Sequence, residues 1–82
     1  MEYVWDSKDE EQRVKQLVGR MYYYFNYQGE KQYEVILSYY KTSQRYLYVV
    51  YNLKFNKSSA VDALNILRYP KAYILLEDKT CD

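Results

Sequence analysis

The sequence predicts a single small α+β domain over residues 1–82, with an antiparallel sheet and two helices on one face in the order β-α-β-β-α-β. Three observations predict this class. The chain has 82 residues, which allows one modest hydrophobic core. Segments 33–41 and 45–55 are rich in β-branched and aromatic residues, as strands are. Helix-start signals at Ser7 and Ser59 precede apolar residues at helical spacing.

The N-terminal quarter predicts a short strand and a helix. Residues 1–5 (MEYVW) have strand propensity, and the Ser7 to Glu10 spacing is a capping box that starts a helix. Apolar residues then continue at helical spacing, which favours a helix ending before Gly29. They are Val14, Leu17, Val18, Met21, Tyr22 and Phe25. The alternative is a helix that stops at Gly19, because glycine costs about 1 kcal/mol in a helix interior. Residues 20–27 would then be a strand.

The two central strands are joined by residues 42–44, a connection of hairpin length. In the second strand the odd positions are the apolar set and are expected to face the helices: Leu47, Val49, Tyr51, Leu53 and Phe55. The even positions then face away. In the first of the two strands the sequence leaves open which alternate residues face the helices. Both sets contain apolar residues: Val35, Leu37 and Tyr39 in one, and Ile36 and Tyr40 in the other.

The C-terminal third predicts a second helix and a last strand. The Ser59 to Asp62 spacing starts the helix and Pro70 ends it, with an inner stripe of Ala60, Ala63, Leu64 and Leu67. Residues 71–77 form the last strand, with Ala72, Ile74 and Leu76 inward, and 78–82 a flexible polar tail. This order is the ferredoxin-like arrangement, and the alternative with 20–27 as a strand is an α-β-β-β-α-β meander. The expected core is Val14, Leu17, Leu47, Val49, Leu53, Leu64 and Ile74.

The composition argues against an enzyme. The chain has no histidine and one cysteine, Cys81, so the usual zinc sites and the histidine-dependent nucleophile systems are excluded. We find no catalytic group, cofactor site or metal site, and the early acidic residues are explained by the helix start. Without a signal peptide, a long apolar run or a disulfide, a cytoplasmic protein is expected.

Tyrosine is over-represented, with 13 of 82 residues. A tyrosine ring with its polar tip suits half-exposed sheets and interfaces. The predicted alternation gathers aromatic side chains on the sheet face away from the helices, with two cations close by: Tyr3, Trp5, Tyr46, Tyr48 and Tyr73, with Arg45 and Lys54. An uncovered patch of this kind marks a binding surface.

Residues 44–51 (QRYLYVVY) resemble the ribonucleoprotein motif on the third strand of RNA-recognition-motif domains. The three aromatic positions and the valine match, whereas Gln44, Arg45 and Leu47 depart from the motif. The resemblance implies that Tyr46 and Tyr48 stack on bases and that Tyr3 stands for the first-strand aromatic.

Two functions therefore follow from the sequence. The first is a small interaction module whose tyrosine face binds a protein partner or a second copy. The second is a single-stranded RNA or DNA binder. The net charge of +1 favours the first, because phosphate neutralisation supplies most non-specific affinity for nucleic acid. In size and composition the chain also resembles small accessory proteins of phages and archaeal viruses, including inhibitors of host machinery, which implies the host cytoplasm.

Overall fold

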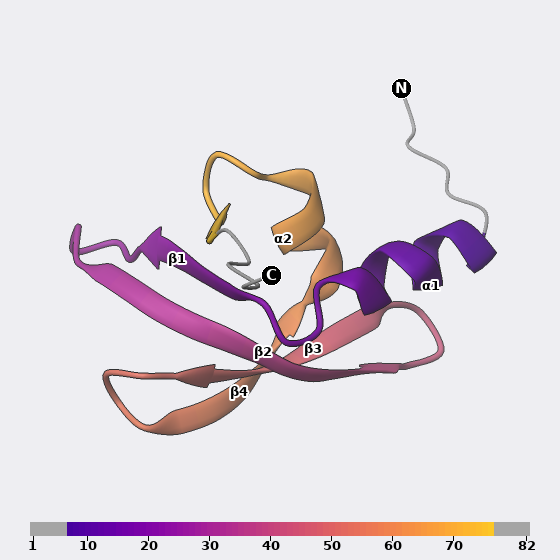
Figure 1. Cartoon of the computed structure of the whole chain (residues 1–82), viewed down its shortest axis with the longest axis horizontal. Coiled ribbons are helices and arrows are strands. Elements are labelled where there is room, and N and C mark those ends of the chain that lie inside the picture. Colours follow the sequence, from indigo (N-terminus) through magenta and orange to yellow (C-terminus); the bar gives the residue numbers. More distant parts are fainter. Residues whose placement is uncertain (1–6, 77–82) are drawn as a thin grey trace, which may run out of the picture.

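The computed structural model describes residues 7–76, which form a five-stranded antiparallel sheet with two short helices on one side (Figure 1). The elements along the chain are α1 (Ser7–Gln16), β1 (Met21–Phe25), β2 (Lys31–Lys41), β3 (Tyr46–Asn52), β4 (Lys57–Asp62), α2 (Ala63–Arg68) and β5 (Ile74–Leu75). Across the sheet the strands run β4-β3-β2-β1-β5. The α+β class is confirmed, and the ferredoxin-like order is not. The strand predicted at 1–5 and the tail at 78–82 lie outside the described residues.

The first helix is shorter than the predicted one. α1 ends at Gln16, and Gly19 follows at φ +92°, a conformation that glycine adopts without steric cost. The Gly19 amide donates to the carbonyl of Ile36 at 2.7 Å, which ties the end of the helix to β2. Met21–Phe25 is then a strand between β2 and β5. The long helix to Gly29 is therefore wrong, and the alternative strand within 20–27 is confirmed.

The second helix starts later than predicted, because a strand precedes it. Residues 57–62 pair with β3 as β4, so the predicted helix start at Ser59 is wrong. Asp62 caps α2 instead, and its carboxylate accepts from the amide of Leu64 at 3.0 Å. The β3–β4 turn depends on Asn52, whose side-chain oxygen accepts from the amides of Lys54 at 2.9 Å and Phe55 at 3.0 Å.

A β-bulge in β2 explains why the sequence could not show which alternate residues of this strand face the helices. Ile36 pairs with Val50 and Ser38 pairs with Val49, so Leu37 is an extra residue on this strand. Before the bulge the even positions lie on the helix side, and after it Tyr39 does. One alternation pattern cannot describe both halves of the strand.

The core lies between the helices and one face of the sheet, which we call the helix face. Its buried apolar residues are Val14, Leu17, Tyr22, Ile36, Tyr46, Tyr48, Val50, Ala63 and Ile66. Val14 and Leu17 are confirmed as core. The other predicted core residues are only half-buried (Leu47, Val49, Leu64 and Ile74) or, for Leu53, 46% exposed.

The predicted faces of β3 were therefore wrong, and tyrosine is the reason. The aliphatic residues Leu47 and Val49 were expected inside, but Tyr46 and Tyr48 are buried, with 4% and 0% of their surface exposed. The Tyr48 hydroxyl donates to the carbonyl of Val14 at 2.7 Å. Burial of a tyrosine is favourable when its hydroxyl has such a partner, because its ring buries more area than a leucine or valine side chain does.

We expect Ile36→Ala to lower the free energy of unfolding by about 2–5 kcal/mol, because it leaves a cavity beneath the helices. Leu53→Ala should cost less than about 1 kcal/mol, since the side chain is half exposed in the β3–β4 turn. Urea unfolding of both variants measures the difference. Equal losses at the two positions would contradict the assigned faces.

Candidate binding surface on the open face of the sheet

The sheet face opposite the helices, which we call the open face, is lined by apolar side chains from every strand except the edge strand β4. Strand register and alternation place them there. They are Met21, Tyr23, Phe25, Tyr33, Val35, Leu37, Tyr40, Leu47, Val49, Tyr51 and Ile74. On β4 this face carries small and polar residues, Ser58, Ala60 and Asp62.

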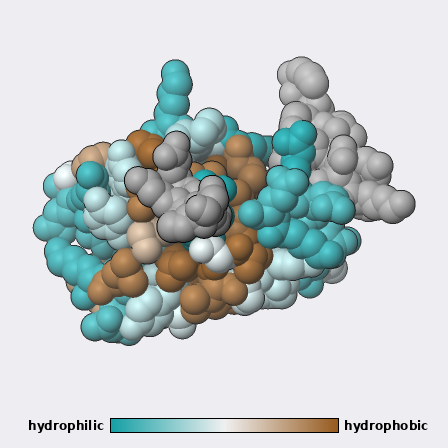
Figure 2. All heavy atoms as spheres, viewed as in Figure 1, coloured by the Kyte–Doolittle hydropathy of each residue, from teal (hydrophilic) through white to brown (hydrophobic). Residues whose placement is uncertain are grey.

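Many of these side chains are well exposed. Phe25 is 56% exposed, Leu37 52%, Tyr40 44% and Tyr33 37%, which are high values for large apolar groups. Within residues 7–76 both helices lie on the other side of the sheet. Figure 2 shows hydrophobic residues gathered over the strands in the lower middle of the view, whereas hydrophilic residues cover α1 at the right. The open face is a contiguous apolar surface without a cover among the described residues.

An aromatic cluster occupies the β1–β2 end of the open face. The Tyr23 ring lies 5.7 Å from the Tyr33 ring across the strand pair and 6.0 Å from the Phe25 ring. Lys31 places its ammonium 4.4 Å from the Tyr23 ring centroid and 5.6 Å from that of Tyr33. A cation over these ring faces is a stabilising contact, and it shields part of the cluster from water.

The centre of the open face carries no charge. Val35, Val49 and Tyr51 lie in its middle rows, and the charged side chains lie at the ends of the strands. Arg45 is within 3.6 Å of the Asp62 carboxylate at one end. At the other end Lys54 is within 3.9 Å of Glu30. Because both cations have acidic neighbours, neither presents an isolated positive charge to a ligand.

The structure separates the residues that the sequence grouped into one site. Tyr46 and Tyr48 lie buried on the helix face, so they have almost no surface with which to stack on a base. Tyr73 is half-buried, and its ring packs 5.7 Å from those of Tyr22 and Tyr24 on the helix face. Arg45 and Lys54 are exposed and ion-paired. Tyr3 and Trp5 lie outside the described residues.

The sequence missed the aromatic residues that do line the open face, for a different reason on each strand. Tyr23 and Phe25 were missed because β1 was predicted as helix. Tyr33 and Tyr40 were missed because the facing residues of β2 were left open, and Tyr51 because the faces of β3 were assigned in reverse. The alternative reading of 20–27 as a strand was the signal that could have found the first two. Once β1 is a strand, the alternation of its aromatic residues sends Tyr23 and Phe25 to one face.

A group of polar side chains lies buried on the helix face, around Glu34. Its carboxylate accepts from the Tyr22 hydroxyl at 2.5 Å and from the Asn52 amide nitrogen at 3.0 Å. The same nitrogen donates to the Gln32 side-chain oxygen at 3.1 Å. Because Asn52 also holds the β3–β4 turn, this network has a structural role: it fixes the register of three strands.

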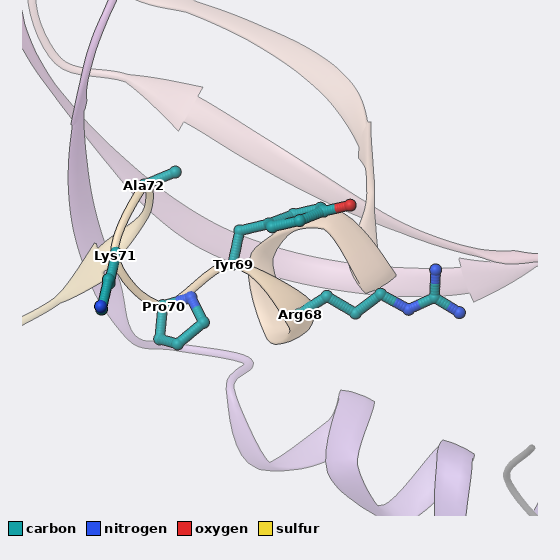
Figure 3. Close-up of a pocket in the computed structure, with 5 residues that line it drawn as sticks. All are labelled: Arg68, Tyr69, Pro70, Lys71 and Ala72. Carbon is teal, nitrogen blue, oxygen red and sulfur yellow. The ribbon is translucent and has the colours of Figure 1, made fainter. Parts of the chain in front are cut away.

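A shallow pocket of about 350 Å³ lies on the connection between α2 and β5 (Figure 3). It is lined by Arg68, Tyr69, Pro70, Lys71 and Ala72, and the side chains of Arg68 and Lys71 point in different directions. Its walls are mostly apolar and come from one short segment, so they bring no set of polar groups together at one point.

Within residues 7–76, no three histidine, cysteine, aspartate or glutamate side chains are grouped as metal ligands. No helix in the same range is long and apolar enough to cross a membrane.

Comparison of the chain with protein-family models, with curated proteins and with solved structures finds no match. The geometry of the open face is therefore the basis for assigning a function.

We expect the domain to lose stability in alkali. Burial raises the pKa of the Tyr48 hydroxyl, and burial together with the Glu34 carboxylate raises the pKa of Tyr22, both above the ordinary value of about 10. Above that pH the unfolded chain releases these two protons while the folded chain keeps them. The free energy of unfolding should then fall, by about 1.4 kcal/mol per pH unit for each of the two tyrosines.

Urea unfolding between neutral pH and strong alkali measures this slope, and tyrosinate absorbance follows the ionisation. Tyr48→Phe should reduce the slope, whereas Tyr27→Phe, at a residue 96% exposed, should leave it unchanged. A flat profile through pH 10 to 11 in the wild-type chain would contradict the burial of the two hydroxyls.

Proposed function

We propose that this chain is a small non-enzymatic interaction module that binds a protein through its open face. The observation that carries the proposal is the contiguous exposed apolar surface formed by strands β1, β2, β3 and β5. Monomeric proteins rarely expose a patch larger than a few hundred Å², and larger patches mark interaction sites. Exposed tyrosine and phenylalanine rings are the residues most enriched at the centres of protein interfaces.

The charges around the open face favour a protein over a nucleic acid. A nucleic-acid groove needs cations that can neutralise several phosphates. Here Arg45 and Lys54 are paired with carboxylates, and the middle rows of the face are uncharged. A protein partner needs only apolar complementarity at the centre and polar contacts at the rim.

One observation keeps single-stranded nucleic acid as the second candidate. Lys31 lies beside the exposed rings of Tyr23 and Tyr33, and a base could stack on the rings while the ammonium contacts its phosphate. This alternative uses the β1–β2 end of the open face, whereas the RNA-recognition-motif resemblance used Tyr46 and Tyr48 on β3.

A photocrosslinking amino acid placed at Tyr40, on the open face, tests the proposal in the cells that naturally produce the chain. We expect irradiation to yield a covalent product with a protein. The matched control is the same amino acid at Tyr69, which is 54% exposed at the end of α2 and should give no such product.

A product at Tyr40 that nuclease digestion removes would replace the proposal with the nucleic-acid alternative. The absence of any product at Tyr40, with the variant folded and expressed, would refute a binding role for the open face.

A further inference from the structure

We infer that the protein partner of the open face is a second copy of this chain, packed face to face. The inference rests on the proposed function, because it assigns an occupant to the same surface. In this arrangement two five-stranded sheets stack with their helices outside, and the open faces form the centre of a sandwich. A two-fold axis between the sheets brings the same surface of both chains into contact. If one residue of the first chain meets a second residue of its partner, the reverse contact is also made.

The open face offers a large apolar area. Phe25, Tyr33 and Tyr40 alone leave roughly 200–350 Å² exposed, since a whole aromatic side chain offers about 150–250 Å². Leu37 is 52% exposed, and the other open-face residues are half-buried and add to this area. The open face therefore supplies a substantial part of the roughly 800 Å² per partner that a stable interface buries.

The charge pattern of the open face is compatible with self-contact. A surface that meets itself must not bring like charges together, because such contacts cost several kcal/mol. The middle rows of the open face are uncharged, and the ion pairs Arg45–Asp62 and Lys54–Glu30 lie at opposite strand ends. Lys31 lies at one end of β2, the central strand. Two copies packed with their strands in opposite directions therefore meet without repulsion at the centre and keep their Lys31 ammonium groups at opposite ends.

The open face is also strongly apolar. Interfaces between different proteins are about as polar as the rest of a protein surface, whereas homodimer interfaces are more apolar. Across β3 the open face presents Leu47, Val49 and Tyr51 in succession, and Leu37 is added by the bulge in β2. The composition of the open face thus matches a self-interface better than a transient contact with another protein.

Sedimentation equilibrium of the purified chain over a wide concentration range tests the inference. We expect twice the monomer mass for the wild-type chain, with little dependence on salt because apolar burial is not screened. Leu37→Glu and Phe25→Glu place a charge in the interface and should weaken dimerisation by about 30-fold or more. Both positions are more than half exposed, so the monomer fold should tolerate them, as circular dichroism will check.

Tyr69→Glu is the matched control, at a residue 54% exposed that lies off the open face, and it should leave the dimer intact. A wild-type monomer at every concentration would overturn the second copy as the partner. So would a dimer that persists in both open-face variants or that Tyr69→Glu disrupts.

A photocrosslinker at Tyr40 of the purified chain separates this inference from the proposed function. A covalent dimer formed by the purified chain alone supports the inference. If Tyr40 gives no product in the purified chain but couples to a different protein in cells, the second copy is refuted and the protein-binding function stands. If neither experiment gives a product, both proposals fail.

Discussion

Burial of tyrosine rings with their hydroxyl groups hydrogen-bonded is the constraint on which this structure depends. The Tyr48 hydroxyl donates to the carbonyl of Val14, and the Tyr39 hydroxyl donates to the Glu11 carboxylate at 2.9 Å. These bonds connect β3 and β2 to α1, a helix whose sequence is mostly polar. An unsatisfied buried hydroxyl costs free energy, so the helix must sit where its acceptors meet these rings. The positions of α1 and the sheet are thus fixed by polar atoms at the tips of apolar groups.

The Glu34 network extends this constraint to the far end of the sheet. Tyr22 and Asn52 both donate to Glu34, and Asn52 in turn accepts from the amides of the β3–β4 turn. The turn brings β4 back against β3, and Asp62 at the end of β4 then caps α2. One side of the sheet therefore supplies the helix contacts and the buried polar groups. The open face takes no part in this network.

The sequence was informative about element types and much less about faces. The α+β class, the central strand pair, the helix start near Ser7 and the end of α2 before Pro70 followed from local signals, and all agree with the structure. Strand β1 was predicted only as the alternative, because the apolar residues from Val14 to Phe25 also fit a helix unless Gly19 ends it. Strand β4 was missed because Lys-Ser-Ser-Ala has little strand propensity and forms a strand only by pairing with β3.

The faces were assigned in reverse because hydropathy ranks leucine and valine above tyrosine. A hydropathy scale gives tyrosine a lower value because of its hydroxyl group, and it takes no account of a hydrogen-bond acceptor that the fold places beside that group. For Tyr48 the acceptor is the carbonyl of Val14 on α1, 34 residues away in the chain, so no local window of the sequence reveals it. The bulge at Leu37 adds a second long-range effect, because it is visible only in the pairing of β2 with β3. The sequence therefore predicted an uncovered tyrosine-bearing face, but the residues that form it are different ones.

The two faces of the sheet use tyrosine for different physical reasons. On the helix face the hydroxyls of Tyr22, Tyr39 and Tyr48 have fixed acceptors inside the chain. On the open face Tyr51 donates to the side chain of Asn56 at 3.0 Å, while the hydroxyls of Tyr33 and Tyr40 have no hydrogen-bond partner within residues 7–76. Water can satisfy these groups as long as the face is uncovered, which makes the exposed rings less unfavourable than phenylalanine or leucine would be. Any partner that covers the face must then offer acceptors or donors at these positions, or leave the hydroxyls at a wet rim. A two-fold contact meets this condition when the Tyr33 and Tyr40 hydroxyls of each copy lie at the edge of the interface, because the two residues lie near opposite ends of β2.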